Sequence, residues 1–185
     1  IFIGAFLFYL TPENVRNSAI EIVEPRNLPE IFERDFSTTE KWWYKGGCGR
    51  YFRTKTLPEI ASGARKKSTS RDVRVVILDP LNKKLCEAHA IYRKSTASAE
   101  LEKQKWNIDK VRQELYATIV TVLVFEKEEP MLRIDLSLAP HYSSFRIDLS
   151  STSAIVTKED RKAPAIVCQA GSYYYSSYEN EIVLS

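Results

Sequence analysis

Cysteine and glycine are scarce in this 185-residue sequence, which contains three cysteines and six glycines. Cys48, Cys86 and Cys168 lie far apart and form no CxxC pair, so a structural zinc site is not expected. An odd and sparse set of thiols is typical of a reducing compartment, which favours an intracellular domain. With so few glycines and only eight prolines, a long disordered linker is not expected either.

The sequence also lacks the short motifs that mark common enzymes and nucleotide-binding proteins. It contains neither GxxxxGK[ST] nor GxGxxG, so no nucleotide-binding fingerprint is present. No GxSxG elbow is present, and the two histidines, His89 and His141, lack the HExxH spacing of a zinc-binding helix. We therefore predict no metal, no cofactor and no complete catalytic motif.

Length and charge set further bounds. A chain of 185 residues favours one domain, and 44% hydrophobic with 28% charged residues is ordinary for a globular protein. The net charge of +3 is too small to indicate a nucleic-acid-binding protein by itself. The distribution of the basic residues is therefore more informative than their total.

Residues 1–10 are apolar throughout, without a polar face. As a helix they would span about 15 Å, half of the hydrocarbon core of a bilayer. Because the chain begins with Ile1 and its only methionine is Met131, we expect further residues before it. We predict the end of a membrane anchor and a connector over 1–27, and a domain over 28–185 on the cytoplasmic side of the inner membrane. A buried core strand is the alternative for the apolar run.

The middle of the chain predicts a parallel strand–helix–strand unit. Residues 42–44 are of strand type, and the glycines within 46–49 force a turn. An apolar stripe at helical spacing opens with Pro58, and the apolar run 73–78 indicates a buried strand. Further helices are expected near 28–32, over 82–98 and from 108, and further strands over 132–138, 144–149, 153–157 and 165–168. The predicted fold is α/β, a mixed, partly parallel sheet flanked by helices.

Basic residues gather around the glycine turn. Between Lys45 and Arg74 there are nine basic residues and two acidic ones. Backbone N–H groups of a glycine turn can bind an anion, and the arginine fork matches phosphate. We therefore predict Lys45, Arg50 and Arg53 as binding residues for a phosphate-containing ligand. The alternatives are a tight turn with solvated arginines, and basic residues that face anionic lipid.

Two further positions are candidates for a site. Asp79 ends the strand over 73–78, and ligands of open α/β sheets lie beyond the carboxyl ends of strands. We include Asp79 among the ligand-binding residues, although a cap on the following helix is the favoured role. His141 precedes two serines and Asp148, so base or nucleophile chemistry is the alternative to a structural loop histidine.

The stretches WWYKGG, GRYFRTKTLPEIASGARK, RDVRVVILDP and LCEAHAIYR lie within 42–93, and FRID follows at 145–148. Together they resemble the phospholipase D-like superfamily, which implies one half of such a fold, in a degenerate bacterial form, with an inherited phosphate-binding cleft. In that family the histidine of an HxK motif attacks phosphorus. Here Arg146 stands in the histidine place and Asp148 in the lysine place. Because arginine stays protonated, the resemblance implies binding without catalysis and adds Arg146 to the ligand-binding residues.

The function predicted from these features is that of a non-catalytic sensing or interaction domain of a bacterial membrane protein. We expect it to recognise a phosphate-bearing ligand, a nucleic acid or a protein partner, and the resemblance implies a role as an antiviral defence effector. A divergent phosphodiesterase or nuclease that uses His141 with Asp148 or Asp160 is the first alternative. An oligomerisation scaffold, in which the chain forms a homo-oligomer, is the second.

Overall fold

The computed structural model describes residues 20–97, 99, 105–160 and 162–185. The apolar run at 1–10, predicted to end a membrane anchor, lies outside these residues. Within the described part of the chain, no helix is both long and apolar enough to cross a membrane.

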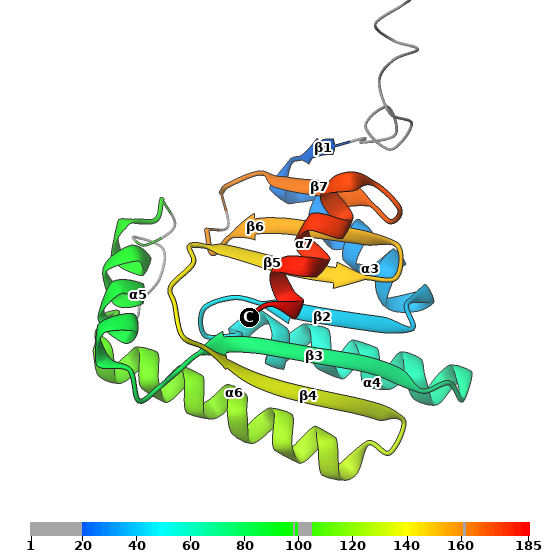
Figure 1. Ribbon diagram of the computed structural model, residues 1–185, viewed down its shortest axis with the longest axis horizontal. Coiled ribbons are helices and arrows are strands. Elements are labelled where there is room, and N and C mark those ends of the chain that lie inside the picture. The colour runs from blue at the N-terminus through cyan, green and yellow to red at the C-terminus, as the bar shows by residue number, and fades with distance from the viewer. Residues whose placement is uncertain (1–19, 98, 100–104, 161) are drawn as a thin grey trace, which may run out of the picture.

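A seven-stranded mixed sheet forms the centre of the protein (Figure 1). Its strands are β1 (Ile20–Val23), β2 (Lys41–Lys45), β3 (Arg71–Leu78), β4 (Leu132–Ala139), β5 (Phe145–Ser150), β6 (Ser153–Lys158) and β7 (Ala165–Gln169). Their order is β1-β7-β6-β5-β2-β3-β4. β2, β3 and β4 are parallel, whereas every other neighbouring pair is antiparallel. The prediction of a mixed, partly parallel sheet is confirmed.

Helices cover both faces of this sheet. They are α3 (Leu28–Thr38), α4 (Leu57–Lys67), α5 (Lys83–Ser95), α6 (Ile108–Glu128) and α7 (Tyr173–Val183), with short helical turns η1 (Pro25–Asn27) and η2 (Phe52–Thr56). In Figure 1, α7 crosses the front of the sheet, while α3, α4 and α6 lie behind it. The sheet is therefore the middle of three layers.

The side-chain pattern of β3 explains why both faces need cover. Val73, Val75 and Ile77 point into the larger core shared with α3, α4 and α6, whereas Val76 points into the smaller core under α7. A central parallel strand that is apolar on both sides is stable only when both sides are buried. The predicted strand–helix–strand unit is confirmed as β2, α4 and β3, with β2 parallel to β3.

Two elements of the described chain have no counterpart in the sequence-based prediction. Strand β1 pairs antiparallel with β7, so the sheet includes residues before 28, where the domain was expected to begin. Helix α7 is capped by Ser172, whose side chain accepts a hydrogen bond from the backbone N–H of Tyr175 at 3.2 Å. It packs on the sheet through Tyr175, Tyr178 and Ile182.

Candidate functional site

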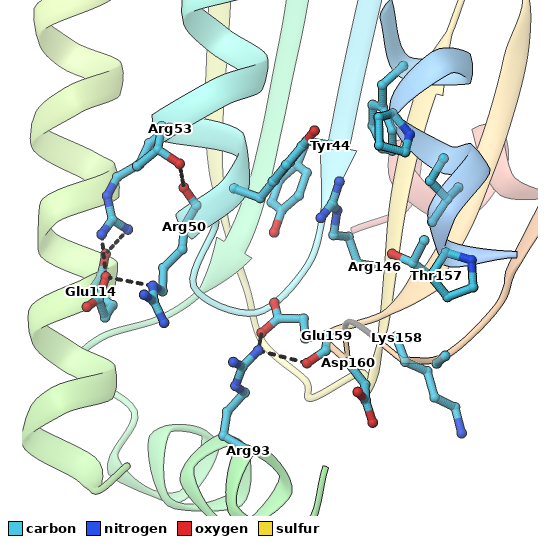
Figure 2. Close-up of a pocket in the computed structure, with 17 residues that line it drawn as sticks. Tyr44, Arg50, Arg53, Arg93, Glu114, Arg146, Thr157, Lys158, Glu159 and Asp160 are labelled. Atoms are coloured by element: carbon cyan, nitrogen blue, oxygen red, sulfur yellow. Dashed lines mark hydrogen bonds and ion pairs between the residues drawn. The ribbon is translucent and has the colours of Figure 1, made fainter. Parts of the chain in front are cut away.

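A pocket of about 700 Å³ opens at the end of the sheet where β2 and β6 finish and β5 begins. Its walls come from η1, α3, the turn after β2, α5, α6, β5 and the segment after β6 (Figure 2). Its lining residues are Pro25, Leu28, Pro29, Phe32, Tyr44, Arg50, Tyr51, Arg53, Thr54, Arg93, Glu114, Arg146, Thr157, Lys158, Glu159, Asp160 and Ala163. Five of these side chains are basic and three are acidic, so a ligand meets an excess of positive charge.

One wall is built by Arg50, Arg53 and the buried Glu114 of α6. Arg53 is fully engaged, because it contacts the Glu114 carboxylate and donates to Thr118 Oγ1 at 3.0 Å. Arg50 makes a loose ion pair, with 3.7 Å between its Nε and Glu114 Oε2, and its guanidinium lies 5.5 Å from the centre of the Trp106 ring. Burial opposes ionisation of Glu114, but hydrogen bonds from Lys110 and Arg53 outweigh it and lower the pKa of this carboxyl. Glu114 is therefore an ionised anchor that positions Arg53 and leaves Arg50 adaptable.

Arg146 forms the opposite wall at the start of β5. Its Nε donates to Asp148 Oδ2 at 2.5 Å, and its guanidinium lies 4.6 Å from the centre of the Tyr51 ring. Asp148 is completely buried and also accepts from Trp42 Nε1 at 3.3 Å. Burial raises the pKa of Asp148, against the opposing charge of Arg146. Within the described chain, neither Nη atom of Arg146 or Arg50 makes a hydrogen bond, so both forks can take a ligand.

Glu159 lies between Arg93 and Arg146 at the centre of the site (Figure 2). Arg93 Nη1 is 3.1 Å from Glu159 Oε2, and the buried ring of His89 lies behind it, with Nε2 at 3.4 Å. Burial opposes ionisation of Glu159, but the charges of His89, Arg93 and Arg146 lower its pKa. Burial also lowers the pKa of His89, with Glu159 acting in the opposite sense. Glu159 is thus a carboxylate held in place by its basic neighbours.

The glycine turn after β2 closes this cluster instead of binding an external anion. The N–H of Gly47 donates to Glu159 Oε1 at 3.1 Å, and the N–H of Gly46 donates to the Val76 carbonyl at 3.0 Å. A Cβ atom at Gly47 would lie 2.2 Å from His89 Cε1, which explains the glycine there. The carboxylate of Glu159 therefore occupies the place at this turn where an external anion was predicted to bind.

Of the five predicted ligand-binding residues, three line the pocket and two lie elsewhere. Arg50, Arg53 and Arg146 line the pocket. Lys45 does not: it lies buried on the α7 side of the sheet, where its Nζ donates to Glu181 Oε1 at 2.6 Å.

Asp79 also lies away from the pocket. Its Oδ1 accepts from the N–H of Leu81 at 2.8 Å, which makes a tight turn. The favoured role of Asp79 as a helix cap is wrong in detail, because the cap of α5 is Asn82, whose Oδ1 accepts from Leu85 N at 3.3 Å.

The residues of the catalytic alternative are not brought together. His141 is exposed in the loop between β4 and β5, with its Nε2 3.5 Å from Lys45 Nζ on the α7 side of the sheet. Asp148 is buried on the other side, beneath Arg146. Asp160 does line the pocket, and its Oδ1 accepts from Lys162 N at 3.0 Å. In the described residues, no three His, Cys, Asp or Glu side chains are grouped as metal ligands.

Sequence reasoning missed Arg93, Glu114 and Glu159. Glu114 left a signal, because it sits on the apolar face of α6 between Val111 and Thr118, both buried. A lone acid at such a position indicates a buried ion pair. The sequence gives no sign of the pairing of Arg93 with Glu159, because the two residues are far apart in the sequence and meet only in the folded protein.

Comparison with known proteins yields little. No family model and no curated protein matches the chain. Among solved structures, it is similar to TrmBL2, an archaeal chromatin protein described as showing a novel mode of DNA binding, with a TM-score of 0.47 and 7% identity. The match covers 98% of this chain and 56% of that one, so the chain spans about half the length of TrmBL2. This similarity is too low to carry an argument about function.

Proposed function

We propose that this chain is a non-catalytic binding domain whose pocket takes a small anionic ligand that carries a phosphate group. One observation carries the proposal: Arg50 and Arg146 stand on opposite walls of one pocket, each with its Nη atoms unused by the rest of the described chain. Arginine forks match the oxygens of a phosphate and bind it through paired, charge-assisted hydrogen bonds.

The charge balance favours a doubly charged group. Five basic and three acidic side chains line the pocket, and the acids are engaged by basic residues or backbone N–H groups. A phosphate monoester dianion would neutralise the remaining excess, whereas a single carboxylate would neutralise half of it.

The composition of the pocket favours binding over turnover. No histidine, cysteine or serine is among the described residues that line it. Arg146 stands where the resemblance to phospholipase D-like proteins places the attacking histidine, and a protonated guanidinium is no nucleophile. We extend the proposal to a sensing role next to a membrane anchor, which the apolar run at 1–10 suggests.

Isothermal titration with inorganic phosphate tests the binding site. Arg50→Ala removes one fork and should weaken binding about ten- to hundredfold, the value of one charge-assisted hydrogen bond. Arg146→Lys keeps the charge beside Asp148 but loses the fork, and should weaken binding similarly. Arg133→Ala is the control, because Arg133 is an exposed arginine of β4 outside the pocket. Equal affinity in all four proteins would refute the proposal.

A second assay addresses the enzymatic alternative. Wild-type protein is incubated with bis(p-nitrophenyl) phosphate, with and without Mg²⁺ or Mn²⁺. We expect no release of nitrophenol above the protein-free rate. Turnover that His141→Ala abolishes would replace the binding domain with a phosphodiesterase.

A further inference from the structure

Part of the pocket wall is apolar, and a bare phosphate would gain nothing from contact with it. Pro25 of η1, together with Leu28 and Pro29 at the start of α3, lines the side next to Arg146, and Phe32 lies behind them. Burying such a surface stabilises a complex only when the ligand contributes apolar area of its own. The phosphate is therefore attached to an organic body.

The shape of this wall favours a planar body. Tyr51 is 38% exposed, and the centre of its ring lies 5.5 Å from that of Phe32 and 4.6 Å from the Arg146 guanidinium. It offers a flat surface beside the proposed phosphate site, and the two proline rings add apolar area next to it. Aromatic side chains next to arginine are the arrangement on which nucleobases stack.

Hydrogen-bond acceptors lie on the far side of the same pocket. Glu159 is kept ionised by its basic neighbours, and the carboxylate of Asp160 follows it at the rim. Two carboxylates repel a second phosphate but accept hydrogen bonds from hydroxyl groups. Each of their oxygens already accepts one hydrogen bond within the chain and has a second lone pair, so a body with neighbouring hydroxyls, such as ribose, can add hydrogen bonds to them.

From these three features we infer that the ligand is a nucleoside monophosphate, with its phosphate between Arg50 and Arg146. Its base lies on Tyr51 and the apolar wall of Pro25, Leu28 and Pro29, and its ribose hydroxyls face the carboxylates. This inference rests on the proposed anion-binding function and adds the class of ligand to it. The pocket, at about 700 Å³, is within the range of sites that enclose molecules of this size.

Titration calorimetry with four probes tests the inference: AMP, inorganic phosphate, glucose 6-phosphate and adenosine. We expect AMP to bind at least about tenfold more tightly than each of the other three, because only AMP offers both a phosphate and a stacking base. Equal affinities for AMP, phosphate and glucose 6-phosphate would overturn the nucleotide assignment while leaving the anion site standing. No binding of any phosphorylated probe would overturn both.

Substitutions in the apolar wall separate base recognition from phosphate recognition. Tyr51→Leu and Leu28→Ser should each weaken AMP binding about tenfold and leave the affinity for inorganic phosphate unchanged. If the substitution of Tyr51 disturbs Arg146, the Leu28→Ser variant still tests the inference, because Leu28 lies on a different element, α3. The control, Arg133→Ala, should change neither affinity. If AMP binds equally well to both wall variants and the wild type, the base does not lie on this wall and the inference fails.

Discussion

Arg146 is held between a buried carboxylate and an aromatic ring, and this position explains how a charged side chain can line a pocket while its partner sits in the core. Asp148 is buried within the layer of Trp42 and Tyr44. A carboxylate in such surroundings is tolerated only because Arg146 and Trp42 donate to it. The pair therefore has a structural role as well as the proposed binding role.

Arg146→Ala should lower the free energy of unfolding by about 3–5 kcal/mol, because it leaves Asp148 buried without its counter-charge. Urea unfolding followed by tryptophan fluorescence measures the loss. The double variant Arg146→Met/Asp148→Leu removes both charges and should recover at least half of it. A double variant as unstable as the single one would show that the unpaired carboxylate is not the cause.

Because His89 is buried, we expect the free energy of unfolding to depend on pH. Burial lowers the pKa of its imidazole below the usual 6.5, with Glu159 opposing and Arg93 reinforcing this shift. As the pH falls below about 6.5, the unfolded chain takes up a proton that folded His89 does not, so stability falls until the lowered pKa is reached. Urea unfolding at pH 7.5, 6.5 and 5.5 should show this loss. His89→Gln should flatten the curve over that interval, and an unchanged slope would exclude His89 as the source.

At the scale of elements, the turn between β2 and η2 depends on glycine for two separate reasons. Gly49 has a φ of +70°, and a Cβ atom there would lie 2.9 Å from the Thr118 side chain of α6. Gly171, before α7, has a φ of +82° but open space around its Cβ position. The two positions share the backbone cost of a side chain at positive φ and differ in packing.

Gly49→Ala should therefore destabilise the protein more than Gly171→Ala does. We expect about 1–2 kcal/mol for Gly171→Ala and about 1–3 kcal/mol more for Gly49→Ala, which adds overpacking against α6. Thermal unfolding of both variants beside the wild type measures the difference. Equal losses would show that α6 yields to the added methyl group.

Helices and strands could be predicted from the sequence wherever the spacing of apolar residues fitted one of the two clearly. The strand-type residues of β2, the helical stripe of α4 and the apolar run of β3 were sufficient for the parallel unit. The site was predicted in part: Arg50, Arg53 and Arg146 line the pocket, but Lys45 follows Tyr44 on β2 and so must point to the opposite face. That alternation was available in the sequence. The pairing of Arg93 with Glu159 was not, because it depends on how α5 packs beside the end of β6.

At the scale of the whole molecule, the two faces of the sheet have different roles, one structural and one that includes the proposed binding site. The α7 side carries the small core and the ion pair of Lys45 with Glu181. The α3, α4 and α6 side carries the large core, which ends in the arginine-lined pocket. The carboxyl ends of sheet strands are where α/β proteins place ligands, and the pocket occupies the end of β2.

A crystal structure of the full chain grown with inorganic phosphate tests the central claim most directly, because it locates the anion. The account predicts phosphate in the pocket, with its oxygens within hydrogen-bonding distance of the Nη atoms of Arg50 and Arg146. An empty pocket at saturating phosphate, or an anion bound only at the Lys45 side of the sheet, would contradict it.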